Sequence, residues 1–177
     1  MPPNVDTSIL DTISKDRGTN LLQEATKAYP YLKGKDIAYK YTPSKDERML
    51  EFYRGEDIPE WGKGKQVAIE VFNPKTRPID VLGDYVSHYG VQADPKLKEL
   101  YSGFAGSLDP KMMQERYQYH VKNFGEKRPY DQWYQATGLP EMFRGYTFNQ
   151  WGKDAARMYT PQQLDYLNQV RQYLGVK

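Results

Sequence analysis

The chain has 177 residues, a length that suits one domain able to bury a hydrophobic core. Its 25 Lys and Arg residues against 23 Asp and Glu give a formal net charge of +2, which lacks the one-signed field of a dedicated nucleic-acid-binding protein. The absence of cysteine excludes a disulfide framework, a thiolate metal site and a cysteine nucleophile.

Aromatic residues make up 14% of the chain, and 16 of them are tyrosines, which predicts a core of rings with polar tips. No apolar run approaches the roughly 20 residues of a membrane span. The N-terminus lacks the basic and then apolar pattern of a classical export signal. The sequence therefore predicts a soluble protein.

Residues 1–36 are predicted to form a helical N-terminal segment. Ile9 and Ile13 lie at helical spacing, and the apolar pattern resumes at Leu21, after Gly18. Two short helices, or one helix broken near Gly18, fit this pattern. It leaves open whether the segment packs on the core or reaches out as an arm.

Residues 37–75 change to short stretches that are rich in aromatic and β-branched residues. These stretches are "IAYKY" (37–41), "MLEFY" (49–53) and "VAIEVF" (67–72), separated by Pro, Gly and charged residues. They predict a small antiparallel three-stranded sheet at about residues 37–72. Alternation along the third strand indicates that at least one side of the sheet is buried.

Residues 76–177 are predicted to be predominantly helical. Proline follows a helix-start residue in Arg77-Pro78, Asp94-Pro95, Asp109-Pro110 and Thr160-Pro161. The predicted helices are Ile79–Tyr89, Pro95–Phe104, Pro110–Phe124, Tyr130–Thr137 and Pro161–Leu174, the last of them capped by Gly175. Together with the sheet, this pattern predicts an α+β fold in a single domain over residues 1–177.

Asp80, Asp84 and His88 are expected on one helix face, at positions i, i+4 and i+8. Two carboxylates and an imidazole at this spacing are able to hold a divalent metal. The segment lacks the H-E-x-x-H motif of zinc proteases. We therefore expect Asp84 and His88 to pair on a partly solvated face, with no cofactor, and a metal site formed by the three residues is the alternative.

The sequence contains no motif for nucleophilic or phosphate chemistry. It has no G-x-S-x-G elbow, and Ser107 is expected in a turn before a helix cap. Neither phosphate-binding glycine loop occurs, and "WGKGK" (61–65) is expected to form a hairpin loop. We expect no catalytic residues. The alternative is a carboxylate- or metal-dependent hydrolase that uses Glu70, Asp84 and His88.

The stretch "RYQYHVK" interleaves aromatic and basic residues on a predicted helix, as surfaces that stack on single-stranded nucleic acid do. Helical geometry separates them, because Arg116 and His120 share one face while Tyr117 and Val121 share another. One of these faces is therefore expected to be core.

Residues 139–151, "LPEMFRGYTFNQW", hold four aromatics, an arginine and two amides. We expect a packing or docking corner here rather than a catalytic site, because Trp, Tyr and Arg dominate both binding hot spots and polar cores. Gly138 and Gly145 are expected as left-handed helix C-caps. The residues expected to form the interface or its scaffold are Trp133, Phe143, Arg144, Tyr146, Phe148 and Trp151.

Three stretches carry a resemblance to a known group of proteins. These are "GDYVSH" (83–88), "FGEKRPYDQW" (124–133) and "FRGYTFNQW" (143–151). With their spacing, about the last hundred residues resemble a module of uncharacterised, virion-associated proteins encoded by tailed phages and prophages. The resemblance attaches no catalytic role to any residue.

The resemblance implies a structural or interaction protein of a phage particle, in virion assembly or genome delivery. It implies protein partners, either other virion components or the chain itself, and a location in the virion or the cytoplasm of the infected bacterium. The alternatives are the hydrolase, acting on the host envelope, and a host-directed inhibitor or nucleic-acid-associated protein.

Overall fold

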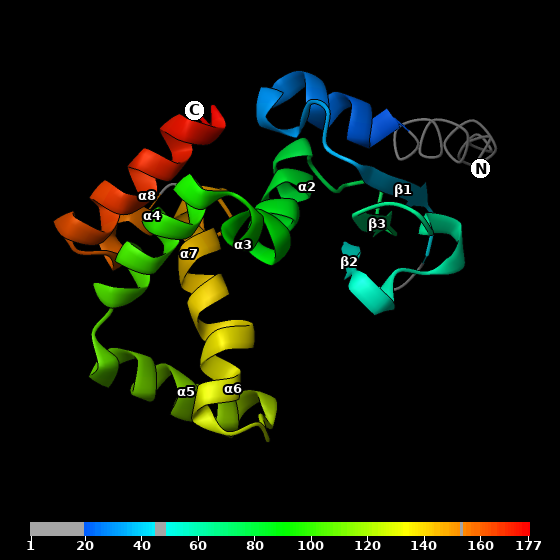
Figure 1. Ribbon diagram of the computed structural model, residues 1–177. Helices are drawn as coiled ribbons and strands as arrows, with labels where there is room; N and C mark the ends of the chain where they lie inside the picture. The colour runs from blue at the N-terminus through cyan, green and yellow to red at the C-terminus, as the bar shows by residue number, and fades with distance from the viewer. Residues whose placement is uncertain (1–19, 45–48, 153) are drawn as a thin grey trace, which may run out of the picture. The chain divides into compact units, whose positions relative to one another are not determined.

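The computed structural model describes residues 20–44, 49–152 and 154–177 (Figure 1). It divides into two compact units, Met1–Tyr85 and Val86–Lys177. The first contains the sheet and the second is helical, so the predicted α+β composition, with the helices mostly in the C-terminal half, is confirmed.

The first unit contains a three-stranded sheet. Its strands are β1 (Ile37–Tyr41), β2 (Leu50–Arg54) and β3 (Val67–Val71), in the order β1-β3-β2. β2 runs antiparallel to β3, but β1 runs parallel to it, with Ile37 opposite Val67. The sheet is therefore mixed, and the prediction of an antiparallel sheet is wrong for the β1–β3 pair.

The position of β3 follows from its composition. Val67, Ala68, Ile69 and Val71 are buried on both faces, as in the near-continuous apolar run of a central strand. β1 and β2 are only half-buried and lie at the edges. The strand with the most apolar sequence thus takes the middle of the sheet, although it comes last in the chain.

Helical elements complete the first unit. A helix covers residues 20–28, and its Leu21 and Ala25 are buried. The 3-10 turn Pro30–Leu32 buries Leu32, so residues 20–32 contribute buried side chains to the core of this unit. The predicted helix near Ile9 and the break at Gly18 lie outside the described residues. The remaining elements are the 3-10 turns Gly55–Asp57 and Glu60–Gly62 and helix α2 (Pro78–Tyr85).

The second unit is built from helices. They are a π-helical segment (Val86–Gly90), α3 (Val91–Ala93), α4 (Pro95–Gly106), α5 (Pro110–Phe124), α6 (Tyr130–Trp133), a second π-helical segment (Tyr134–Gly138), α7 (Leu139–Thr147), a 3-10 turn (Ala155–Met158) and α8 (Pro161–Leu174). Its largest fully buried side chains are Leu97, Phe104, Met113, Trp133, Met142, Phe143, Phe148, Leu167 and Leu174. Tyr159 is also buried, and its hydroxyl donates to the carbonyl oxygen of Met142 at 2.7 Å, which confirms the expected core of rings with polar tips.

Helix ends in this unit follow the local signals in the sequence. The side chains of Asp94 and Asp109 accept backbone hydrogen bonds at the starts of α4 and α5, and Thr160 forms a capping box with Gln163 at the start of α8. Gly175 ends α8 in the left-handed conformation, at a φ of 73°. These observations confirm the predicted caps. The caps were predictable because each depends on only a few neighbouring residues.

The segment from Tyr130 to Thr147 differs from its prediction. It is helical throughout, as α6, the π-helical segment and α7. The helix over 139–147 was indicated in the sequence only as a short helical stretch before Gly145. Gly138 has a φ of −61°, and Gly145 lies inside α7, so neither is a left-handed cap. Both glycines instead lie against an aromatic ring that leaves no space for a side chain. A Cβ atom on Gly138 would lie 2.7 Å from the Trp133 indole, and a Cβ atom on Gly145 would overlap the Trp151 indole.

Among the described residues, none of the helices combines the length and apolar character needed to cross a membrane.

Candidate functional site

The C-terminal end of α5 exposes three large apolar side chains. Tyr119 is 57% exposed, Val121 38% and Phe124 69%, all within six residues. We call these three residues the α5 tip. Over its whole length α5 buries only Met113, so this helix packs on its neighbours along a narrow stripe. Water-exposed rings gathered at one helix end are characteristic of an interaction surface.

The rings of the tip contact one another and a buried layer beneath them. Tyr119 and Phe124 meet edge to face, with centroids 5.8 Å apart, and His120 lies 5.3 Å from Phe124. His120 in turn lies 5.2 Å from Trp133, which is fully buried. The aromatic contacts thus run continuously from the core of the second unit to its surface.

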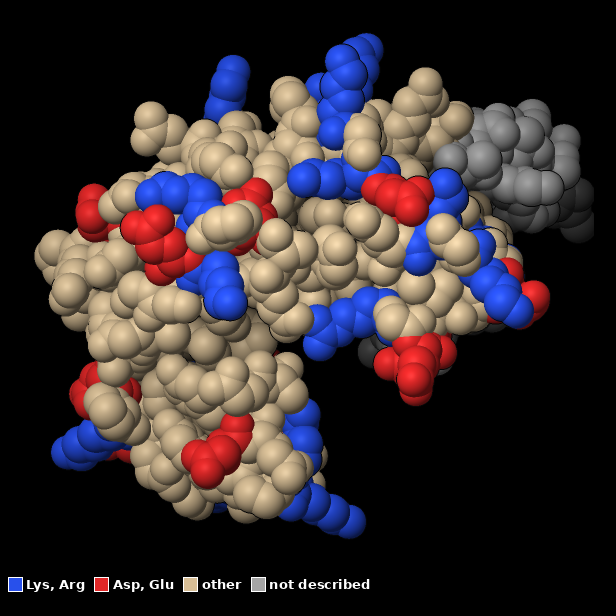
Figure 2. Space-filling model, in the orientation of Figure 1, with Lys and Arg blue, Asp and Glu red and all other residues tan. Residues whose placement is uncertain are grey.

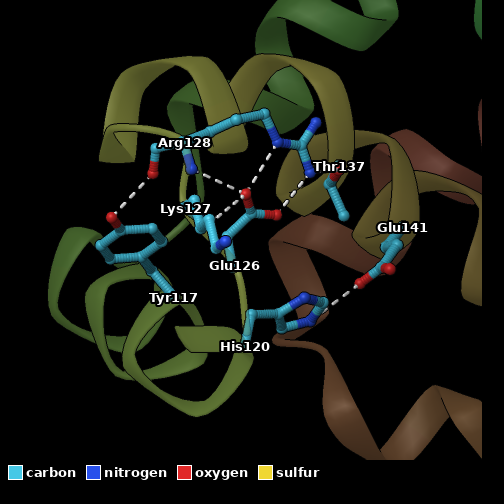
Figure 3. A network of polar contacts seen from close by, with 7 residues as sticks. All are labelled: Tyr117, His120, Glu126, Lys127, Arg128, Thr137 and Glu141. Atoms are coloured by element: carbon cyan, nitrogen blue, oxygen red, sulfur yellow. Dashed lines mark hydrogen bonds and ion pairs between the residues drawn. The ribbon is translucent and has the colours of Figure 1, made fainter. Parts of the chain in front are cut away.

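The loop that follows the tip is held by one carboxylate (Figure 3). Glu126 accepts hydrogen bonds from the backbone nitrogens of Lys127, at 3.0 Å, and Arg128, at 2.9 Å, and forms a bidentate ion pair with the Arg128 guanidinium. Arg128 also donates to the Thr137 hydroxyl at 2.9 Å, and Tyr117 donates to the Arg128 carbonyl oxygen at 2.8 Å. The loop therefore joins α5 to the π-helical segment through defined polar contacts.

The hydrogen bonds to this carboxylate also change its acidity. The hydrogen bonds from the Arg128 side chain and backbone lower the pKa of Glu126 from 4.5 to about 2. Glu126 therefore stays ionised well below the pH at which an ordinary glutamate is protonated.

A second carboxylate joins α5 to α7. Glu141 lies 3.5 Å from His120 Nε2 and 3.5 Å from an Arg116 nitrogen. Arg116 also lies over the Trp151 ring, 5.2 Å from its centroid. The side of α5 that faces the rest of the unit therefore carries Arg116, Tyr117 and His120, all three half-buried. Met113 is the buried residue of α5, so the expectation of a core face within "RYQYHVK" is not confirmed.

The six residues expected to form an interface or its scaffold divide into two groups. Trp133, Phe143 and Phe148 are fully buried, so in this fold they are scaffold and present no surface to a partner. Trp133 packs against Tyr117, at 5.4 Å, and Phe143 against Tyr101, at 4.9 Å. Burial results from contacts between segments distant in sequence, which the local pattern did not contain.

Arg144, Tyr146 and Trp151 are half-buried. The Tyr146 hydroxyl donates to Asn168 at 2.8 Å, and the Arg171 guanidinium lies over its ring, 5.2 Å from the centroid. Trp151 stacks on Tyr159, with ring centroids 6.2 Å apart. Tyr146 thus ties α7 to α8, and Trp151 packs against a later part of the chain. Of the exposed rings among the described residues, the two with the largest exposed fractions, Tyr119 and Phe124, lie at the α5 tip.

The alternative metal site is not formed. Across the described ranges, no three His, Asp or Glu side chains are grouped so that they could hold a metal ion, and Asp80, Asp84 and His88 are all within those ranges. Asp80 forms a bidentate ion pair with the Arg77 guanidinium, at 2.7 and 3.0 Å. α2 ends at Tyr85, and His88 lies in a π-helical segment, whose i to i+5 bonding changes the register assumed for one α-helical face.

Glu70, the alternative catalytic residue, is engaged within the sheet. Its carboxylate accepts hydrogen bonds from Thr42 at 2.6 Å and Tyr53 at 3.3 Å, and lies 3.6 Å from the Lys40 ammonium. Its side chain is only 12% exposed, and a carboxylate in such a place needs these partners to offset the loss of water. The arrangement is that of a structural ion pair.

Charged side chains of both signs are mixed on the visible surface. Figure 2 shows Lys and Arg interspersed with Asp and Glu over the visible face, where the described residues form no broad area of one sign. The described residues of this visible face therefore form no broad basic patch of the kind that attracts phosphate groups.

Comparison of the chain with protein families, curated proteins and solved structures finds no match.

The α5 tip was only partly visible in the sequence. Tyr119 belongs to the stretch "RYQYHVK", which drew attention as an aromatic and basic surface. Phe124 did not stand out, because a phenylalanine at the end of an amphipathic helix is usually core. Its exposure depends on α5 having neighbours along one narrow side, a property of tertiary packing.

Proposed function

We propose that the chain is a non-enzymatic structural protein of a tailed-phage particle that docks to copies of itself through the α5 tip. The observation that carries the proposal is the exposure of two rings that contact each other at one helix end, Tyr119 and Phe124. Other large apolar side chains exposed in the described ranges, Met49, Met158 and Tyr173, are far apart in sequence, and scattered apolar residues on a surface are ordinary.

The setting of the tip favours docking. Binding hot spots are rings held in place before the partner arrives, because ordering a mobile side chain costs free energy on association. The Glu126 contacts fix the chain directly after Phe124, and buried Trp133 lies under His120. The tip is therefore already ordered for contact.

A second copy of the chain is the partner that the tip fits best. In a twofold dimer the same patch meets itself, so the patch must be chemically complementary to itself. Aromatic rings meet this requirement, because they pack edge to face against other rings. The resemblance of the last hundred residues to virion-associated phage proteins supports a particle built from such repeated contacts.

Light scattering over a range of protein concentrations tests this proposal. The average molar mass of the wild type is expected to rise with protein concentration. For Phe124→Ser the same rise should require about tenfold higher concentration, since losing a hot-spot ring costs on the order of 1–2 kcal/mol of binding free energy. Met158→Ser is the matched control, because Met158 is 53% exposed and lies outside the tip. A monomer at every concentration, or equal behaviour of the two variants, would contradict the proposal.

A further inference from the structure

A pocket of about 470 Å³ opens in the second unit, between the junction of α4 with α5 and residues 130–135. Its lining includes two buried apolar side chains, Leu108 and Met113, which give it an apolar floor. Met113 lies near the start of α5, whereas the α5 tip lies at the other end of this helix. The pocket is therefore a feature separate from the proposed docking surface.

Two tyrosine rings line the pocket. Tyr130 and Tyr134 are one helical turn apart, and their ring centroids are separated by 5.9 Å. The Tyr130 ring is held by contacts with Tyr117, at 5.5 Å, and with buried Trp133, at 6.0 Å. Burial is the main cause that raises the pKa of both phenols, so both rings are uncharged at neutral pH. The faces of such rings attract cations.

Asp131 is the one charged side chain among the residues that line the pocket. It is exposed, and within the described parts of the chain its carboxylate has no ion-pair or hydrogen-bond partner. Its charge contributes to the raised pKa of Tyr130, so the carboxylate acts on the ring beside it. Gln135 follows one turn later and adds an amide oxygen, which is a hydrogen-bond acceptor. The pocket thus combines negative charge with an apolar floor.

The charged residues that neighbour the pocket in the chain do not neutralise Asp131. Arg128 forms its bidentate ion pair with Glu126. Asp109 caps α5 by accepting the backbone N–H of Lys111 at 2.9 Å, and neither Asp109 nor Lys111 lines the pocket. The lining therefore carries a single negative charge, and a cation with an apolar body is complementary to it.

We infer that this pocket binds the ammonium group of an alkylamine, whose hydrocarbon chain lies on the apolar floor. The ammonium group lies against the rings of Tyr130 and Tyr134 and donates a hydrogen bond to the Asp131 carboxylate. Free amines and the side chain of lysine share this chemistry. The inference does not depend on docking through the α5 tip, so either proposal can fail without the other.

The test titrates the full chain with n-butylammonium and follows the backbone amide signals by NMR. Neutral n-butanol, a probe of nearly the same size, is the matched comparison. We expect saturable shifts around residues 105–113 and 130–135 with butylammonium, and about tenfold weaker binding of butanol, which loses both the cation–π attraction and the ion pair. Equal affinity for the two probes, or shifts confined to other residues, would overturn the inference.

Variants assign the contacts. Asp131→Asn is expected to weaken butylammonium binding by roughly threefold, since an exposed ion pair contributes modestly, and to leave butanol binding unchanged. Tyr134→Leu removes a ring and should also reduce the preference for the charged probe. Asp57→Asn removes an exposed carboxylate in the first unit and is the control, with no expected effect on either probe. Circular dichroism checks each fold, and an unchanged preference in folded Asp131→Asn would contradict the site.

Nα-acetyl-lysine N-methylamide distinguishes the two sources of the ammonium group, because it carries the butylammonium chain on a peptide backbone. Binding at least as tight as that of butylammonium would assign the pocket to a lysine side chain of a partner protein. Clearly weaker binding would assign it to a free amine, because the backbone is then excluded. Both results support the ammonium site, and they differ only in where the ligand comes from.

Discussion

Single residues in the second unit are constrained by ring contacts that a local pattern does not reveal. A glycine that ends a helix cannot be told in the sequence from a glycine that packs directly against a ring. Gly138 and Gly145 pack against rings. Gly175 ends α8 as predicted because its role involves only its own turn. The difference is whether the deciding contact is with the backbone of the helix turn itself or with a ring whose position depends on the packing of the unit.

At Gly145 this reasoning predicts a loss of stability on substitution. A Cβ atom there would overlap the Trp151 indole, so Gly145→Ala should lower the free energy of unfolding by about 1–3 kcal/mol, the usual cost of overpacking. Urea unfolding measures the change. Gly106→Ala is the matched control, because a Cβ atom at that helical position meets nothing within 4 Å, and it should be neutral or stabilising by up to about 1 kcal/mol. Equal effects would contradict the ring contact.

Glu126 predicts a pH dependence. Its pKa in the folded chain, about 2, lies below the ordinary value of 4.5, so its contribution to stability is complete above pH 4.5 and is lost as the pH falls toward 2. Glu126→Gln should therefore destabilise the chain at pH 6 and converge with the wild type near pH 2. Thermal unfolding across this pH range measures the difference in stability. Glu115→Gln, at an exposed position of α5, is the control for the loss of one charge. A constant difference at all pH values would contradict the assigned ion pair.

At the scale of elements, the sequence predicted most helices and all three strands. The helix starts were predictable because Asp94, Asp109 and Thr160 cap the turns that follow them. The parallel pairing of β1 with β3 was not predictable, because it joins residues about 30 positions apart and leaves β2, which comes between them in the chain, on the other side of β3. Local signals specify elements, and packing decides how they pair.

The helix α5 has one fully buried side chain. Met113 is its single buried residue, so Met113→Ala should cost about 2–5 kcal/mol, the range for truncating a buried methionine. Hydrogen exchange should also show faster exchange along α5 than in α8. Met112→Ala, at a half-buried position, is the control, and its cost should stay near about 1 kcal/mol. A similar cost for both variants would contradict the special contribution of Met113.

At the scale of the whole molecule, the aromatic residues have two different roles. Composition alone predicted an aromatic core, and the buried rings of Phe104, Trp133 and Phe143 provide it. Composition did not show which rings would be left outside, because exposure at Tyr119 and Phe124 follows from the sparse packing of α5. The fold class was therefore accessible from the sequence, and the proposed docking surface required the structure.

The most direct measurement is site-specific photo-crosslinking with a benzophenone amino acid placed at position 124 or, as a control, at position 173, where Tyr173 is 46% exposed in α8. The proposal that copies dock through the α5 tip predicts crosslinked dimers from position 124 and only monomer from position 173, with mass spectrometry locating the bond near Tyr119 or Phe124 of the second copy. Crosslinks of equal yield from both positions, or none from position 124 at concentrations where the protein associates, would contradict it.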